Sequence, residues 1–151
     1  AIADHIKKTY NLAVGDKMAE IIKIQIGSAV PVDQELVMTV KGRDHLTGLP
    51  RSIEIGTNEI VRAISKELRT MVGAIKDVLQ ETPPELAADI IDNGITMTGG
   101  SAQLRNFAEL IFRRTGVKAR VAKDAQYCVA LGTGEALKHL DTYKKAVIAK
   151  R

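Results

Sequence analysis

The chain has 151 residues, of which 45% are hydrophobic, and a formal net charge of +4 at pH 7. This length suits one domain or two small lobes and provides enough apolar residues for a core. The absence of Trp, beside only three Tyr and two Phe, argues against a nucleic-acid-binding protein that stacks bases. A single cysteine, Cys128, excludes a disulfide framework and a cysteine-based metal site and fits a reducing cytoplasm. We expect neither a membrane-spanning helix nor a signal peptide.

Two helices are predicted at the start of the chain. Ile2, Ile6 and Tyr10 share one helical face, and because this pattern begins without a Met or a cap we expect a piece of a longer protein. A second helix is expected over residues 17–26, capped by Asp16 and ended by Gly27. It carries Glu20 and Lys23 three residues apart. Spacing alone favours a surface ion pair of small worth over a polar clamp beside a ligand.

A hairpin is expected next. Residues 37–41 and 51–55 alternate between apolar and polar side chains and flank a loop that contains Gly and Pro. The "KGRD" stretch, Lys41 to Asp44, could bind an anion. The simpler interpretation, which we favour, is an exposed strand end whose charges compensate one another.

A long helix is predicted after an N-cap at Thr57 or Asn58. We expect its apolar stripe to be core, with a partner helix as the alternative. The members of the stripe are Ile60, Ile64, Leu68, Met71, Val72, Ile75 and Leu79. Gly73 could mark a bend or a close packing point. Pro83 and Pro84 should end this helix, and a short helix should then run to Gly94.

The stretch "GITMTGGSAQLRNFAEL" predicts a strand over 95–98, a turn at Gly99 and Gly100, and a helix over 103–114 capped by Ser101. Such a turn can hold a phosphate or nucleotide, but taken alone it is more often a tight connection. A strand over 117–122 and a last helix from "CVALGTGEALKHL" follow. These elements indicate an α/β lobe interrupted by a smaller α+β lobe.

No catalytic constellation is visible in the sequence. The three histidines, His5, His45 and His139, lack metal-ligand spacing, and no Walker A sequence is present. The basic end, Lys144 to Arg151, is interpreted as a solvated helix end, with an acidic partner or a membrane surface as weaker alternatives.

Four blocks resemble the MreB family of bacterial actins: "KKTYNLAVGDKMAEIIKIQIGSA", "GRDHLTGLPRSIEI", "ETPPELAADIIDNGITMTGGSAQLRN" and "CVALGTGEALKHL". The resemblance covers essentially the whole chain and corresponds to the C-terminal, nucleotide-facing half of that family. It implies an α/β, actin-like ATPase (ribonuclease H-like) lobe with an inserted smaller α+β subdomain. Residues 1–15 and 90–151 would then belong to subdomain IIA, and residues 16–89 to subdomain IIB.

The resemblance also implies a binding site for the adenosine side of ATP. The contacts carried over are Glu20, Ile21, Ile22 and Lys23, with Gly99, Gly100, Ser101 and Ala102. Two positions depart from the family pattern: Ser101 stands in "TGGSA" where the family usually has "TGGGA", and Met18 stands where Thr is usual. The phosphate loops and the catalytic acid of the family lie in its N-terminal half. Mg²⁺ is therefore expected with that half, and we expect no catalytic residue, no metal ligand and no ATP hydrolysis from this chain alone.

The function implied by the resemblance is a cytoskeletal one. The full-length protein would bind ATP and form dynamic filaments at the inner, cytoplasmic face of the cell membrane. These filaments would direct cell-wall synthesis, elongation and cell shape. The expected partners are further copies of the protein and membrane-linked cell-elongation proteins, without nucleic acid. The alternatives are an actin-like filament for another task, such as organelle or plasmid positioning, and a non-polymerising module that binds a partner.

Overall fold

The structure, a computed structural model, describes residues 1–139. The predicted basic helix end at Lys144 to Arg151 lies outside the described residues. The elements are, in chain order, α1 (Ile2–Tyr10), β1 (Leu12–Ala13), α2 (Asp16–Ile26), β2 (Val37–Asp44), β3 (Pro50–Gly56), α3 (Thr57–Ala63), α4 (Ser65–Glu81), α5 (Pro84–Asn93), β4 (Ile95–Met97), the 3₁₀ helix η1 (Gly100–Gln103), α6 (Phe107–Thr115), β5 (Ala119–Val121) and α7 (Cys128–Lys138).

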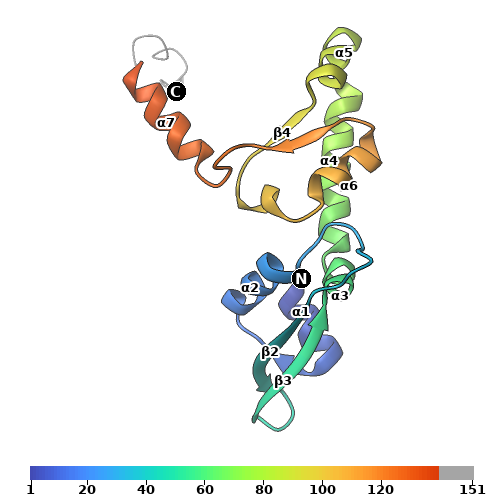
Figure 1. The fold of residues 1–151 in the computed structure, drawn as a ribbon, viewed down its shortest axis with the longest axis vertical. Coiled ribbons are helices and arrows are strands. Elements are labelled where there is room, and N and C mark those ends of the chain that lie inside the picture. Colours follow the sequence, from blue (N-terminus) through green and yellow to red (C-terminus); the bar gives the residue numbers. More distant parts are fainter. Residues whose placement is uncertain (140–151) are drawn as a thin grey trace.

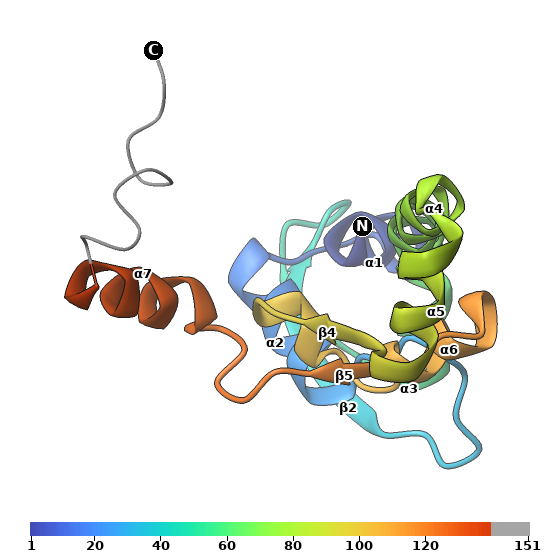
Figure 2. The same cartoon turned by 90° about the horizontal axis from the view of Figure 1, so that it is seen from above.

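Two small sheets lie at different levels of an elongated molecule, and α3 and α4 follow one another from the lower level to the upper one (Figure 1). The lower sheet is antiparallel, with strand order β1-β2-β3, and α1, α2 and α3 lie around it. The upper sheet pairs β4 and β5 in parallel, with α5 and α6 close by. The α7 helix lies apart from the rest of the described chain in both views (Figure 2), and none of its residues is buried. This arrangement agrees with the predicted α/β lobe that carries a smaller α+β lobe.

One connected core joins the two levels. Its buried members extend from Ile2 in α1 to Ile111 in α6. The fully buried aliphatic side chains at its centre are Ile6, Leu12, Ile22, Val40, Ile55, Ile60 and Ile111. Because apolar burial is the main favourable term in folding, this shared core makes the two levels one unit.

The first residues of the chain pack against the hairpin. Leu12 pairs with Asp44 across β1 and β2. The α1 helix is tied to α3 by Glu59, which lies 2.8 Å from the His5 Nε2 atom and accepts a hydrogen bond from the Tyr10 hydroxyl at 2.9 Å. Residues on both sides of residue 15 thus pack together. The predicted subdomain division at that point stays a prediction.

The predicted long helix is two helices. The α3 and α4 helices meet at Ile64, whose backbone (φ −101°, ψ 4°) leaves the helical range, and the bend is not at Gly73. The N-cap is Gly56, so the predicted caps at Thr57 and Asn58 are wrong. The Thr57 side chain is instead buried and bonds to the backbone of Leu36. The predicted stripe is core at Ile60, Ile64, Leu68 and Val72, whereas Met71 is exposed.

The helix predicted over 103–114 begins only at Phe107. The Ser101 residue lies within the short η1 helix and caps nothing with its side chain. The N-cap of α6 is Asn106, which has a left-handed backbone with φ 60°. An L residue reaches this conformation only by leaving the right-handed helix, so the backbone at Asn106 separates η1 from α6.

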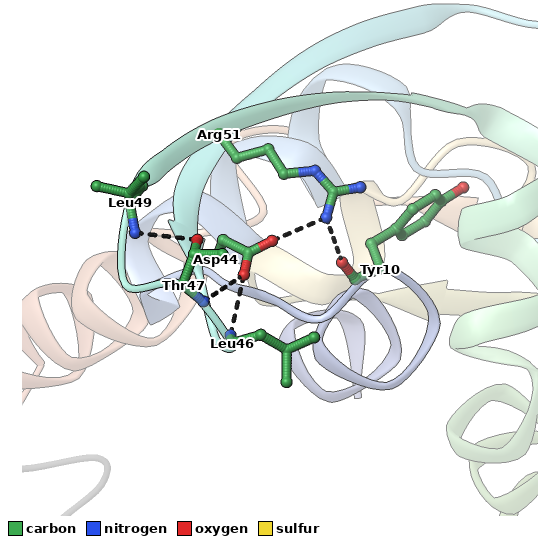
Figure 3. Close-up of polar contacts among 6 residues, drawn as sticks. All are labelled: Tyr10, Asp44, Leu46, Thr47, Leu49 and Arg51. Carbon is green, nitrogen blue, oxygen red and sulfur yellow. Dashed lines mark hydrogen bonds and ion pairs between the residues drawn. The ribbon is translucent and has the colours of Figure 1, made fainter.

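The end of the hairpin is held by Asp44 (Figure 3). One carboxylate oxygen accepts hydrogen bonds from the backbone N–H groups of Leu46 and Thr47, both at 2.9 Å. The other lies 3.0 Å from Nη1 of Arg51, which also donates to the carbonyl oxygen of Tyr10 at 3.1 Å. Asp44 is buried, so the expectation that charges within Lys41–Asp44 compensate one another at an exposed strand end is wrong.

These contacts make the hairpin sensitive to acid. The Thr47 backbone N–H, the Arg51 guanidinium and the Leu46 N–H lower the pKa of Asp44 from 3.8 to about 2. A group with a lowered folded-state pKa stabilises the fold fully above its unfolded pKa, and this contribution is lost as the pH falls through the folded value. We expect Asp44→Asn to lower stability at pH 7, with a difference from wild type that shrinks below pH 4 and is lost as the pH falls through about 2. Urea unfolding across this pH range, with the exposed Asp92→Asn as control, measures it, and a difference that does not change with pH would contradict the assignment.

The core position of Leu68 gives a second test. Its side chain is 4% exposed, whereas Val78 on the same helix is 66% exposed. We expect Leu68→Asp to cost more than about 3 kcal/mol, because it removes buried apolar contacts and buries an unpaired carboxylate. Val78→Asp should leave the fold intact. Circular dichroism and urea unfolding compare the two variants, and a normally folded Leu68→Asp would show that the stripe is an interface.

Candidate functional site

An open cavity of about 550 Å³ lies between α2 and the turn that follows β4. Its volume falls within the range of sites that bind small molecules. The lining residues are Glu20, Lys23, Ile24, Gly100, Ser101, Gln103, Leu104, Arg105 and Gln126. They come from three separate parts of the chain, which only the fold brings together.

The α2 helix forms one wall. It begins at Asp16, with Gly15 as N-cap, so the predicted cap at Asp16 is wrong, and it ends at Ile26 with Gly27 as the predicted stop. Because a helix repeats every 3.6 residues, Ile22 and Ile26 face the core while Glu20, Lys23 and Ile24 line the cavity. Among the described residues no ion pair joins Glu20 to Lys23. The favoured sequence interpretation, a surface ion pair, is therefore wrong, and the helix presents both charges to the cavity.

The glycine turn forms the opposite wall. Gly99 has φ 86°, a left-handed conformation that favours glycine. Its N–H donates to the carbonyl oxygen of Ala125 at 2.7 Å, which anchors the turn to the segment after β5. A Cβ atom built at Gly99 or Gly100 would meet nothing within 4 Å. The backbone of the turn is thus open to close approach, with the exposed Ser101 beside it. The four residues of η1 do not form the long helix whose N-terminus the sequence suggested as an anion site.

A short junction holds the two walls at a fixed separation. The Ala29 N–H donates to the carbonyl oxygen of Arg105 at 2.8 Å, and Nε of Arg105 donates to the carbonyl oxygen of Gly27 at 3.1 Å. The Asn106 amide donates to the hydroxyl of buried Ser28 at 3.1 Å. A Cβ atom at Gly27 would overlap the carbonyl oxygen of Lys23 and lie 3.1 Å from Leu104. Gly27 therefore permits the close contact between the end of α2 and the segment after η1.

The eight residues predicted as ATP contacts divide into three groups. Glu20, Lys23, Gly100 and Ser101 line the cavity. Ile21 and Gly99 are half-buried neighbours of the lining, whereas Ile22 and Ala102 are buried in the core and support the walls from behind. Whether any of the eight touches a nucleotide stays a prediction. Met18, the other departure from the family pattern, is partly buried and packs against the core.

Sequence reasoning missed five lining residues: Ile24, Gln103, Leu104, Arg105 and Gln126. One signal was available, because Ile24 is an apolar residue four positions after Glu20, and side chains four apart are neighbours on a helix. Nothing in the sequence places Gln126 there. Its amide donates to Oε1 of Gln103 at 2.9 Å, a contact across 23 residues that depends on the pairing of β4 with β5.

The lining offers hydrogen-bond donors and acceptors beside apolar surface. A carboxylate, two cationic side chains (Lys23 and Arg105), a hydroxyl and two amides provide the polar groups, and Ile24 and Leu104 provide the apolar surface. No group of three or more His, Cys, Asp or Glu side chains within the described residues could hold a metal ion. Among these same residues, no helix has the length and apolar character needed to cross a bilayer.

Solved structures with the same architecture include MreB 5 of Spiroplasma citri bound to AMPPNP. That structure has a TM-score of 0.87 and 35% identity over 96% of this chain and 44% of its own. The ADP-bound form of the same protein has a TM-score of 0.88. The MamK double helical filament has a TM-score of 0.67 at 19% identity, over 83% of this chain and 38% of its own, which shows the fold alone. The predicted actin-like fold is thus confirmed.

Curated relatives agree with the structural matches. The cell shape-determining protein Mbl of Bacillus cereus is 39% identical over 97% of this chain and 44% of its own length. The cell shape-determining protein MreB of Escherichia coli K12 is 40% identical over 95% of this chain and 41% of its own length. The chain thus spans less than half the length of these relatives.

A family model described as MreB/Mbl protein matches residues 1–145, nearly the whole sequence. The resemblance predicted from the four sequence blocks is confirmed, and the chain belongs to the MreB/Mbl family.

Proposed function

We propose that this chain supplies the adenosine-facing half of an ATP site in a filament-forming cell-shape protein. The observation that carries the proposal is the cavity in which Glu20 and Lys23 lie opposite the open backbone at Gly100. Support comes from MreB 5 of S. citri, which has this fold and is bound to AMPPNP in one structure and to ADP in another.

We assign adenosine, rather than the phosphates, to this cavity. The Glu20 carboxylate would accept hydrogen bonds from ribose hydroxyls, and the Lys23 ammonium group would donate to ribose or ring acceptors. The open turn at Gly99 and Gly100 would let the flat base approach the backbone, since no side chain intervenes. Phosphates and Mg²⁺ would be held by residues outside this chain, where the metal would neutralise charge during phosphoryl transfer. The chain alone is therefore proposed to bind part of ATP without hydrolysing it.

Filament formation is the second part of the proposal. Head-to-tail filaments need different surfaces at the two ends of a subunit. The hairpin lies at one end of the long axis of the molecule (Figure 1). The side chains of Leu46 and Leu49 at its turn are 79% and 64% exposed. Together with α4 it belongs to residues 16–89, which we propose as subdomain IIB. We further propose that the filaments lie at the inner face of the cell membrane and act with membrane-linked elongation proteins in cell-wall synthesis.

The ATP site is tested by Lys23→Ala in the longer protein that carries both halves. ATP binding should weaken by about 1–3 kcal/mol, as expected for the loss of a hydrogen bond to a charged group. Lys17→Ala is the matched control, because Lys17 is exposed on the same helix and does not line the cavity. Isothermal titration calorimetry measures both. Equal ATP affinity in Lys23→Ala and wild type, with the fold intact, would return Lys23 to a surface role.

The filament surface is tested by Leu46→Glu at the tip of the hairpin. In the longer protein this charge should lower the amount of ATP-dependent filament that sediments, without changing the circular dichroism spectrum. Thr70→Glu adds the same charge at an exposed position on α4 and should assemble normally. The 151-residue chain itself should stay in the supernatant with or without ATP. Normal pelleting of Leu46→Glu, or ATP-dependent filaments from this chain alone, would contradict the proposal.

A further inference from the structure

A second groove lies between α4, α6 and the loop after α2, and it shares no residue with the candidate ATP site. Its volume is about 610 Å³. Its floor is apolar and buried, formed by Ala29, Val30, Val61, Leu68 and Val72. The remaining lining residues are Pro31, Ser65, Arg69, Gly73, Lys76, Leu110, Arg113 and Arg114.

The rim of the groove carries positive charge only. Arg69 and Lys76 stand on α4, and Arg113 and Arg114 on α6, while no acidic residue lines the groove. Arg113 is paired with Glu109 on its own helix. For Arg69, Lys76 and Arg114 the described part of the chain provides no ion-pair partner. A concave apolar surface with such a rim is complementary to an apolar ligand face flanked by acidic groups.

Gly73 adds an independent observation. It lies within the continuous helix α4, where glycine costs about 1 kcal/mol relative to alanine. A Cβ atom at this position would meet nothing within 4 Å, so neither predicted role, a bend or a close packing point, is found within the described chain. Glycine thus lowers the stability of α4, and because it has no side chain it leaves the middle of the groove open.

We infer that this groove binds an acidic amphipathic helix of a partner protein. Along α4 the lining runs from Ser65 to Lys76, about 16 Å at 1.5 Å per residue, which matches about three turns of a bound helix. Apolar side chains spaced three and four apart would enter the floor, and acidic side chains beside them would meet the arginines and lysine of the rim. A flat lipid surface is disfavoured because the apolar floor is recessed between two helices.

The probe is a stapled synthetic helix of about four turns with leucines on one face and glutamates beside them. Its matched control keeps the leucines and replaces every glutamate by lysine. Fluorescence anisotropy with the 151-residue chain should show binding of the acidic helix. The lysine helix should bind at least about tenfold more weakly, since like charges oppose one another across the rim. Binding should also weaken with added salt. Equal binding of the two peptides would overturn the inference.

Gly73 provides the matched variants. Gly73→Leu should fill the groove and weaken binding of the acidic helix at least about tenfold, while thermal unfolding shows a helix as stable as wild type or more so. Gly73→Ala should keep binding. Unchanged affinity in Gly73→Leu would overturn the inference. A different result would also overturn it. In that result the acidic helix does not bind, and analytical ultracentrifugation shows wild type self-associating in a way that Gly73→Leu abolishes. Binding to phosphatidylglycerol vesicles with the same sensitivity, and none to the peptide, would assign the groove to lipid instead.

Discussion

The hydrogen bonds between residues 27–29 and 105–106 are the constraint on which both surfaces of this chain depend. They join the end of α2 to the segment after η1, across 78 residues, through Arg105 to Gly27 and Asn106 to Ser28. On one side they fix the distance between the Glu20–Lys23 wall and the glycine turn. On the other side they place Ala29 and Val30 in the floor of the basic-rimmed groove. Ser28 is fully buried and hydrogen-bonded, so opening this junction would be costly, since a buried polar group would lose its partners.

The two cavities also share a physical feature. Each has charged side chains or glycine backbone in its lining. Glu20 and Lys23 are not paired with each other in the described structure, and Gly100 and Gly73 keep open space above the backbone. Elsewhere the chain satisfies its polar groups closely, as Asp44 shows with three donors at the hairpin turn. At Gly100 and Gly73 this open space lies within the lining of a cavity, where a ligand can use it.

Much of this architecture follows from local sequence patterns. Alternation predicted the hairpin, helical spacing predicted the buried stripe at Ile60, Leu68 and Val72, and the glycines after β4 predicted a turn. The misses have long-range causes. Ile64 breaks the predicted long helix, and the junction with Ser28 draws Arg105 out of the helix predicted from residue 103. Asp44 finds its partner on the next strand rather than within its own charged stretch. Local patterns alone did not locate the site, and the family resemblance did. Its walls are far apart in the sequence, and Gln126, for example, reaches the cavity only through the pairing of β4 with β5.

The central claim is that the space above the glycine turn is where adenosine binds, and Gly100→Val tests it most directly. The side chain of valine would enter the cavity, and its Cβ would meet no atom of the described chain within 4 Å, so the fold should survive. In the longer protein, calorimetry should show ATP affinity reduced by more than about tenfold, with the melting temperature in the absence of nucleotide unchanged. Gly73→Val, in the groove away from this site, should bind ATP as wild type does. Wild-type ATP affinity in Gly100→Val would show that the nucleotide does not occupy this cavity.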